Sequence, residues 1–270
     1  MYMQISSADH PNKPPGPLHR TLHSPSSHPY VRDNQTRVIA DPHCHTFASD
    51  GMVTPAQLVE AALKARLDLI AVTDHDTMDS VRETQERGNA AGLTVIGGQE
   101  VTTRWPAQTH IMGWFLEKPV KRGMSLEDTV DAIHDQGALA IVPHPFMPVY
   151  FGSIQPNMLR RLLEKHQVDG IEIVFTVPIG ARRRRQLDQF YITNRERLGA
   201  AIGGSDCHFG AHDIALAVTR YQGDFQTAVR TRATDPERIR YAGRLPTSIA
   251  LRQQWRAMVE LPLMRFRGQL

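Results

Sequence analysis

Short apolar runs alternate with amphipathic stretches along the chain from Val38 onwards. The runs at Leu67–Thr73, Leu93–Ile96 and Ala138–Val142 predict strands, because each is short and bounded by polar or turn-forming residues. One helix start is marked by Thr54 to Gln57, with a capping threonine, a proline at the first helical position and a glutamine that reaches back. The alternation of strands and helices is typical of an α/β fold with parallel strands.

Further strand–helix units follow this pattern through the middle of the chain. They are expected at about 68–91, 93–97, 109–137, 138–165, 168–198 and 199–204. A last strand is expected at Ala215–Tyr221, with helices near 224–232 and 248–258. A barrel and a doubly wound sheet both place their chemistry at the carboxyl ends of the strands, so the pattern alone does not choose between them.

Imidazole and carboxylate side chains stand at the ends of these predicted strands. The nine candidates are His43, His45, Asp50, His75, Glu100, His110, His144, Asp206 and His208. Alternate residues of a strand share a face, so His43 and His45 point into one site, as do Asp206 and His208. Taken alone, His110 is read as a buried core histidine, but burying the whole series without metal leaves many polar groups unpaired. The series therefore predicts a multinuclear divalent-metal site.

These motifs, in this order, resemble the PHP (polymerase and histidinol phosphatase) domain family from about Val38 to His208, and on to about residue 222. The resemblance implies an α/β fold, a distorted (βα)7 barrel of parallel strands with a trinuclear metal centre at their carboxyl ends. It also implies how the ligands are shared. The first metal takes His43, His45, Glu100 and Asp206, the second takes Glu100, His110 and His144, and the third takes Asp50, His75 and His208.

The resemblance implies a metal-dependent phosphoesterase of the stand-alone type. The expected reaction is hydrolysis of a small phosphorylated molecule or nucleotide, a phosphate monoester, by a metal-activated hydroxide. Nitrogen and oxygen ligands suit Mn²⁺, Fe²⁺ or Zn²⁺, and three ions are expected. The alternatives are a metal-dependent hydrolase of another bond, a nuclease on short nucleic acid, or a non-catalytic metal-bound docking module. The helical insertion that nucleotide-specific relatives carry between the equivalents of His110 and His144 is not predicted here, and no residue marks itself as the general acid.

Composition adds the broad limits. The chain has 270 residues, a hydrophobic content of 41% and a formal net charge of +3, which is compatible with anionic substrates but does not by itself indicate nucleic acid. We expect a leader without regular structure at 1–36, a catalytic PHP domain at 37–222 and a helical extension at 223–270. The chain has no apolar stretch long enough to span a membrane and no signal-peptide core, so a cytoplasmic location is expected. The oligomeric state is not predicted.

Several residues beside the ligands leave alternatives open. Cys44 and Cys207 are expected off the metal face as buried small side chains, with ligation or a disulfide as the alternatives. Each of the other flanking residues has two interpretations, namely a structural role in a turn, a loop, a helix cap or, for Glu172, the core, and a role at the site. They are Asp41, Asp74, Asp76, Glu172, His212 and Asp213. Asp74 is expected either in a turn or supporting a ligand, Asp76 as a cap of the next helix, and His212 and Asp213 as solvated loop residues.

Two basic segments complete the sequence. Arg182 to Arg185 open a predicted helix after the sixth strand, where one or two of the four could clamp a substrate phosphate and the others would be solvated or face nucleic acid. The tail from Leu245 mixes arginines with Leu, Ile, Trp and Met residues. We expect this tail to pack on its own domain, with a partner or a membrane surface as the alternatives.

Overall fold

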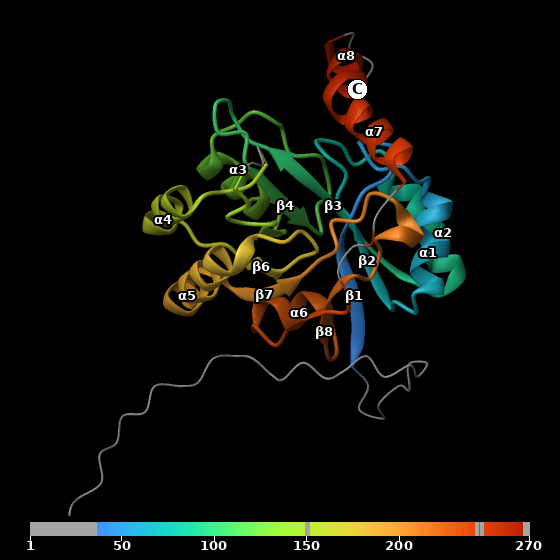
Figure 1. Cartoon of the computed structure of the whole chain (residues 1–270). Coiled ribbons are helices and arrows are strands. Elements are labelled where there is room, and N and C mark those ends of the chain that lie inside the picture. Colours follow the sequence, from blue (N-terminus) through green and yellow to red (C-terminus); the bar gives the residue numbers. More distant parts are fainter. Residues whose placement is uncertain (1–36, 149–151, 241–242, 244–245, 267–270) are drawn as a thin grey trace, which may run out of the picture. The chain divides into compact units, whose positions relative to one another are not determined.

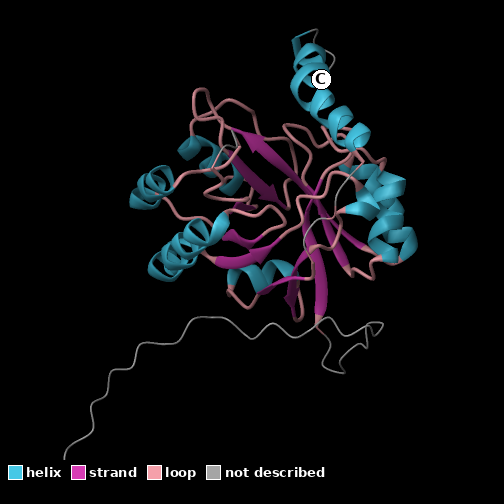
Figure 2. Cartoon of the chain, viewed as in Figure 1, coloured by secondary structure: helices cyan, strands magenta, loops and turns pink. Residues whose placement is uncertain are grey.

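The computed structural model describes residues 37–148, 152–240, 243 and 246–266. The predicted leader at 1–36 lies outside these residues. Within the described part, nine strands form one sheet (Figures 1 and 2). The strands are β1 (Val38–Cys44), β2 (Leu69–Val72), β3 (Thr94–Thr102), β4 (His110–Trp114), β5 (Leu139–Val142), β6 (Gly170–Val174), β7 (Ala200–Gly203), β8 (Ala217–Tyr221) and β9 (Asp235–Arg238).

Helices connect and follow these strands. They are α1 (Pro55–Lys64), α2 (Val81–Ala91), α3 (Leu126–His134), α4 (Pro156–Lys165), α5 (Gly180–Leu198), the 3₁₀ turn η1 (Gly210–His212), α6 (Phe225–Arg230), α7 (Thr247–Trp255), the π-helical η2 (Arg256–Glu260) and α8 (Leu261–Phe266). The predicted start of α1 is confirmed, because the Gln57 amide donates to Thr54 Oγ1 and the Thr54 amide donates to Gln57 Oε1. Between β4 and His144 the described chain contains only α3 and β5, in agreement with the absence of a helical insertion.

The strand order is β7-β6-β5-β4-β3-β2-β1-β8-β9, which wraps into a nearly closed, barrel-like sheet. The predicted α/β barrel class is confirmed, but the strands differ in number and direction from seven parallel strands. Strand β4 runs antiparallel to β3 and β5, β8 runs antiparallel to β1, and β9 runs antiparallel to β8. Residues 103–109 between β3 and β4 are too few for the helical crossover that a parallel pair requires, so the chain must turn back.

One end of this strand order, β7, meets β8, the strand next to the other end, through a side chain instead of a backbone ladder. Thr219 of β8 is fully buried, and its hydroxyl accepts a hydrogen bond from the Gly203 amide at 2.9 Å and donates to the Gly203 carbonyl at 2.8 Å. A side chain at Gly203 would collide with the Val218 carbonyl, which an ideal Cβ would approach to 2.3 Å. The absence of a side chain on β7 therefore lets β8 come close enough for Thr219 to close the sheet.

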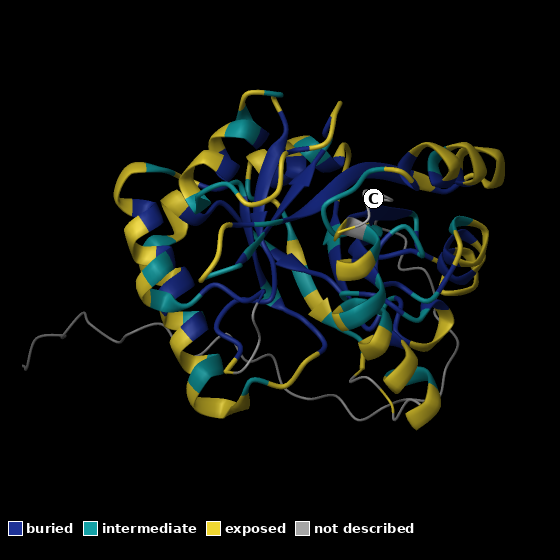
Figure 3. Ribbon diagram, turned by 90° about the horizontal axis from the view of Figure 1, so that it is seen from above, coloured by how far each residue is buried: buried dark blue, intermediate teal, exposed yellow. Residues whose placement is uncertain are grey.

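Three hydrophobic clusters hold the layers together. One lies between the sheet and α3, α4 and α5, and a second lies between the sheet and α1 and α2; Figure 1 shows these helices on opposite sides of the strands. The third cluster fills one end of the barrel interior with Met112, Trp114 and Ile202 and is closed by α6, where Phe225 packs against Trp114. Figure 3 shows the strands buried and the outer helix faces exposed. The barrel thus has an apolar floor.

Residues 223–270 contain the predicted helices and also strand β9, which the sequence pattern does not predict. The C-terminal helices touch the body of the protein through Gln253 of α7 and Arg256 at the start of η2. Large apolar residues of α7, η2 and α8 are exposed, namely Leu251, Trp255, Met258, Leu263 and Phe266. None of the helices in the described residues is both long and apolar enough to cross a membrane.

The closure by Thr219 is open to a direct test. Thr219→Val keeps the shape of the side chain but leaves the amide and carbonyl of Gly203 without a buried partner, so we expect a loss of roughly 1–3 kcal/mol in the free energy of unfolding. Urea denaturation measures this loss. Thr94→Val, at an exposed position of β3, is the control and should change stability little. Equal stability of the two variants would contradict the proposed closure.

Candidate metal centre

The alternation of side chains along the strands carries the candidate ligands to the open end of the barrel interior. On β4, His110 has the same parity as Met112 and Trp114, which face the apolar floor. On β3, Glu100 has the same parity as Ile96, which also belongs to the floor. Each strand therefore gives the interior an apolar residue at one end and a polar ligand at the other.

The carboxylate of Glu100 is the centre of the cluster. Its side chain is fully buried, and its two oxygens face five imidazole rings that come from four separate segments of the chain. The nearest nitrogen–oxygen distances are 3.1 Å to His43, 3.2 Å to His45, 3.4 Å to His75, 2.8 Å to His110 and 3.0 Å to His144. Asp206 approaches His43 and His45 at 3.3 and 3.2 Å. Glu100, these five histidines and Asp206 thus form one continuous group of contacts.

Asp50 and His208 complete the cluster at its outer side. Oδ1 of Asp50 lies 3.1 Å from Nε2 of His208, 3.6 Å from Nε2 of His75 and 4.0 Å from Nδ1 of His45. Three overlapping groups have ligand atoms within 4.8 Å of one another. They are His43, His45, Glu100 and Asp206; then His45, Asp50, His75 and His208; and then His75, Glu100 and His110. The structure brings all nine predicted side chains into one site.

The groups differ in detail from the sharing that the family resemblance implies. The first group is the predicted one. In the second, His45 joins the expected Asp50, His75 and His208. In the third, His75 stands with Glu100 and His110, while His144 approaches the same Glu100 oxygen separately at 3.0 Å.

The spacing of these atoms fits divalent metal ions. Bonds of about 2.1 Å in tetrahedral or octahedral geometry place neighbouring ligand atoms roughly 3.0–3.4 Å apart. Nε2 of His43 and Nε2 of His45 are 3.1 Å apart, and each is 3.1–3.3 Å from Glu100 and Asp206. Among the described residues, Nδ1 of His45 is one of the atoms that are buried without a hydrogen-bond partner. Such atoms are satisfied by a bound cation, and the all nitrogen and oxygen donor set suits Mn²⁺, Fe²⁺ or Zn²⁺.

Glu172 is a residue whose role the sequence left open. It lies buried on β6, accepts a hydrogen bond from Nδ1 of His43 at 2.9 Å and accepts the His144 amide at 2.7 Å. An ideal Cβ at Gly204 would lie 2.3 Å from Glu172 Oε1, so the glycine leaves room for this carboxylate. Glu172 therefore fixes the ring orientation of His43 and the loop that carries His144. Its place between Ile171 and Ile173 in a strand was the available indication that it faces the interior.

Other buried carboxylates hold the loops on which the ligands stand. Asp74 accepts the Thr46 amide at 2.7 Å and the Ser49 hydroxyl at 2.6 Å, and it ties the loop between His45 and Asp50 to the end of β2. This contact favours the second of the two interpretations of Asp74, in which it supports a ligand, here through the loop that carries Asp50. Asp41 accepts the amides of Ser205 and Ala215 at 2.9 and 2.8 Å. Burial raises the pKa of Asp41 to about 7, against the hydrogen bonds from Ser205.

Two expectations about neighbouring residues are wrong. Asp213 is not a solvated loop residue: it is buried and accepts the amides of His208 and Phe209 at 2.7 and 2.9 Å, which fixes the His208 loop. Asp76 does not cap α2, whose N-cap is Ser80; it accepts the Thr102 amide at 2.7 Å because its backbone takes a positive φ of 59° and turns it towards β3. His212 is exposed, as expected.

The cysteines lie as predicted. Cys44 and Cys207 are fully buried and free, and both belong to the cluster between the sheet and α1 and α2. Their side chains therefore point away from the metal face. Burial raises the pKa of the Cys44 thiol to about 11, so that it remains protonated at neutral pH.

Burial and charge act against each other at the centre. Burial alone would lower the pKa of His43, but the carboxylates of Glu172, Asp206 and Glu100 hold that pKa well above its usual value. The pKa of His208 is likewise raised by Asp50 and Asp206 against the effect of burial. Burial opposes ionisation of Glu100, yet the neighbouring histidines keep its pKa well below the usual range. At His75 burial prevails and lowers the pKa to about 4. The buried carboxylates therefore give the site a strong negative charge, which the neighbouring imidazoles partly neutralise.

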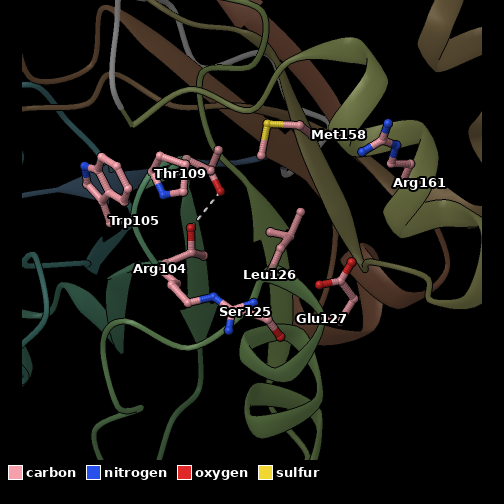
Figure 4. A pocket seen from close by; sticks show the side chains of 11 residues that line it. Arg104, Trp105, Thr109, Ser125, Leu126, Glu127, Met158 and Arg161 are labelled. Carbon is pink, nitrogen blue, oxygen red and sulfur yellow. Dashed lines mark hydrogen bonds between the residues drawn. The ribbon is translucent and has the colours of Figure 1, made fainter.

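A cavity of about 200 Å³ opens beside the cluster. It is lined by the candidate ligands Asp206 and His208 together with Thr176, Val177, Phe209, His212, Asp213, Gly243 and Gln253. A second hollow, of about 230 Å³, lies around Trp105 and Arg161, outside the ligand cluster (Figure 4). It contains no candidate ligand, although Thr109 at its edge directly precedes His110. The cavity beside Asp206 and His208 is therefore the one that meets the cluster.

The arginine run does not line either cavity. Arg183 donates to the Phe146 carbonyl at 3.1 Å, and Arg184 donates to the Ile173 carbonyl and pairs with Asp188 at 3.1 Å. Arg182 and Arg185 are exposed. The two inward-facing arginines of α5 are thus held by backbone carbonyls, one of them in the loop that follows His144.

Comparison with known proteins identifies the family. A family model described as PHP domain matches residues 41–197, more than half of the chain. The chain belongs to the PHP domain family. The family resemblance inferred from the motifs is thereby confirmed.

The chain is similar in sequence and in fold to several proteins, which match different fractions of its length. It is 34% identical over 213 residues to a 3',5'-nucleoside bisphosphate phosphatase of Chromobacterium violaceum, covering 70% of this chain and 73% of that protein. It is 31% identical over 102 residues to a 5'-3' exoribonuclease of Haemophilus influenzae, covering 37% of each. The fold resembles a two-domain protein of Bacteroides vulgatus containing a predicted PHP-like metal-dependent phosphoesterase, with a TM-score of 0.60, 20% identity and coverage of 82% of this chain and 70% of that one.

The central role of Glu100 leads to a prediction about metal content. If each of the three groups holds one ion, the purified protein carries about three ions per chain. Glu100→Ala removes the carboxylate common to two groups and should lower that number and abolish phosphoester hydrolysis. Elemental analysis and a generic phosphoester assay, both after addition of Mn²⁺, measure these effects. Cys44→Ser is the control: it should cost stability but leave metal content and hydrolysis intact, and retention of metal by Glu100→Ala would contradict the assignment.

The raised pKa values lead to a prediction about protons. Below their raised pKa values His43 and His208 carry protons, and a metal ligand must lose its proton, so metal binding should release protons and the apparent affinity should rise with pH. Calorimetric titration with Mn²⁺ at pH 7 in two buffers of different ionisation enthalpy measures the release. His208→Gln should release fewer protons, whereas His134→Gln, which alters a surface pair with Asp169, should match the unmodified protein. A binding enthalpy that is the same in both buffers would contradict the prediction.

Proposed function

We propose that this protein is a metal-dependent phosphoesterase that hydrolyses phosphate monoesters of a small molecule or nucleotide, with the nine clustered side chains holding three divalent ions. Family membership, and relatives whose names describe a phosphatase and a phosphodiesterase, support a phosphoric ester hydrolase. The observation that carries the proposal is the convergence of five imidazoles on the buried carboxylate of Glu100, at distances suited to shared metal coordination. Bound divalent ions supply a nucleophile from water at neutral pH and neutralise charge on phosphoryl oxygens.

The residues of this chain have separate tasks in the proposed reaction. Glu172 orients His43, while Asp74 and Asp213 hold the loops of Asp50 and His208. These contacts keep the ligand atoms in place before substrate arrives, so that little reorganisation is needed during the reaction. The phosphoryl group is expected in the cavity beside Asp206 and His208, because that cavity is the one in contact with the ligand cluster.

The size of that cavity favours a compact substrate. Its volume of about 200 Å³ is below the roughly 300–1,000 Å³ of pockets that enclose drug-sized ligands. A phosphoryl group with a small organic group suits such a cavity better than a folded polynucleotide. The bisphosphate phosphatase relative, matched over most of its length, agrees with a small substrate. The exoribonuclease relatives, of which the chain covers 37% or less, make a nuclease the second candidate.

A substrate panel separates these candidates. Mn²⁺-loaded protein is offered p-nitrophenyl phosphate, bis-p-nitrophenyl phosphate, a nucleoside 3',5'-bisphosphate and a 5'-phosphorylated RNA pentamer, with release of phosphate or nucleotide as the measurement. We expect kcat/KM for the monoester or bisphosphate to exceed that for RNA by at least about tenfold, a difference of roughly 1.4 kcal/mol in transition-state stabilisation. Preferential cleavage of the RNA would favour the nuclease. Failure to hydrolyse any of them with metal bound would overturn the proposal.

A further inference from the structure

The C-terminal helix reaches the metal centre from outside the part of the chain that the family model matches. That match ends at residue 197, whereas α7 spans Thr247–Trp255. Gln253 of α7 is buried, and its side-chain amide donates a hydrogen bond to Oδ2 of Asp50 at 3.0 Å. The other oxygen of the same carboxylate, Oδ1, faces His208 at 3.1 Å and His75 at 3.6 Å. One side of Asp50 thus meets the candidate metal ligands, and the other side meets Gln253.

Arg256, three residues further on, holds the helix against the same loop. Its guanidinium donates to the Ser49 carbonyl at 2.8 Å and to the Phe47 carbonyl at 2.5 Å, and it lies over the Phe47 ring at 5.3 Å from the centroid. Positions 253 and 256 lie on one side of the helix, because residues three apart differ by about 300° around the axis. The loop between His45 and Asp50 is therefore clasped from one side by Asp74 and from the other by this helix.

Polar contacts hold α7 and the start of η2 against the ligand loop, while Leu261 of α8 is the one large apolar side chain that is buried among the described residues of 246–266. None of the described residues of 246–266 belongs to the three hydrophobic clusters of the body. Large apolar side chains of the helix, such as Leu251 and Trp255, are instead exposed. A helix that packs merely to cover a core would turn these residues inward. The inward face carries an amide and a guanidinium that match the carboxylate and the carbonyls of the ligand loop.

We propose that Gln253 is a positioning residue of the metal centre and that α7, anchored by Arg256, is a structural part of that centre. The Gln253 amide holds the Asp50 carboxylate so that Oδ1 faces the metal and Oδ2 does not. Gln253 also lines the cavity beside Asp206 and His208, and the helix therefore forms one wall of the substrate site. The inference rests on the metal site of the proposed function, and it assigns to residues far along the chain the task of presenting one ligand.

Metal affinity gives the first test. Gln253→Met keeps the length of the side chain and removes the donor, and loss of a partner that orients a ligand weakens metal binding by about tenfold to a hundredfold. Calorimetric titration with Mn²⁺ should show such a loss for Gln253→Met and for Arg256→Ala. Arg252→Ala removes an exposed arginine from the same helix and is the matched control, with unchanged affinity. In EDTA the unfolding temperature of Gln253→Met should fall only by the loss of one buried hydrogen bond, and Mn²⁺ should raise it less than it raises that of the unmodified protein, which separates positioning from a general packing role.

Hydrogen exchange gives the second test, because coupling between two sites is reciprocal. If α7 holds Asp50 for the metal, bound metal must in turn hold α7. Mn²⁺ should slow amide exchange in residues 247–255 of the unmodified protein and of Arg252→Ala, but not in Gln253→Met.

Two results would overturn the inference. One is a Mn²⁺ affinity of Gln253→Met equal to that of the unmodified protein, and the other is amide exchange in α7 of the unmodified protein that Mn²⁺ does not slow. Both measurements use metal binding alone. They keep their meaning even if the substrate panel finds no phosphoester hydrolysis, and a normal affinity of Gln253→Met would leave the proposed phosphoesterase activity untouched.

Discussion

The remainder of the structure depends on the burial of one carboxylate, that of Glu100. Glu100 is fully buried, and an ionised carboxylate in such a place is expensive unless compensating charge surrounds it. Five imidazoles provide part of that compensation, at 2.8 to 3.4 Å. Each imidazole stands at or just beyond a different strand end or loop, apart from the adjacent pair His43 and His45. The cluster can therefore form only when the whole barrel is assembled.

The interior of the barrel has two layers, and together they hold the groups that surround Glu100 in place. The lower layer is apolar and is closed by α6, where Phe225 packs on Trp114 and Tyr221. The upper layer is polar and is filled by the ligands. The same strands supply both layers, as Ile96 and Glu100 of β3 illustrate. The apolar layer stabilises the fold, and its rigidity keeps the polar layer in a geometry that unsupported loops would not maintain.

A second set of buried carboxylates stabilises the loops. Asp41, Asp74 and Asp213 accept backbone amides or hydroxyls beside the ligands, and Glu172 does so while also binding His43. Backbone amides that point into a buried site need acceptors, and a carboxylate can satisfy several at once. The side chains of Gln253 and Arg256 extend this arrangement to the C-terminal helix. Support for one ligand loop thus comes from residues separated by about two hundred positions in sequence.

The sequence by itself determined the nine candidate side chains that gather in one site and the class of the fold. The strand period fixes the face of a side chain, so that His43 and His45, and likewise Asp206 and His208, could be assigned to one site from local order alone. The same period left Glu172 undecided, because alternation shows that it lies opposite Ile171 and Ile173 without showing what stands across the barrel. At His144 the period does not apply: Leu139 and Ile141 face the interior, and only a positive φ of 26° turns His144 inward as well. Tertiary structure alone decided the antiparallel course of β4, the closure by Thr219 and the arrival of Gln253 at Asp50. These features depend on which segments become neighbours after folding, and a local pattern of polar and apolar residues carries no information about a partner two hundred residues away.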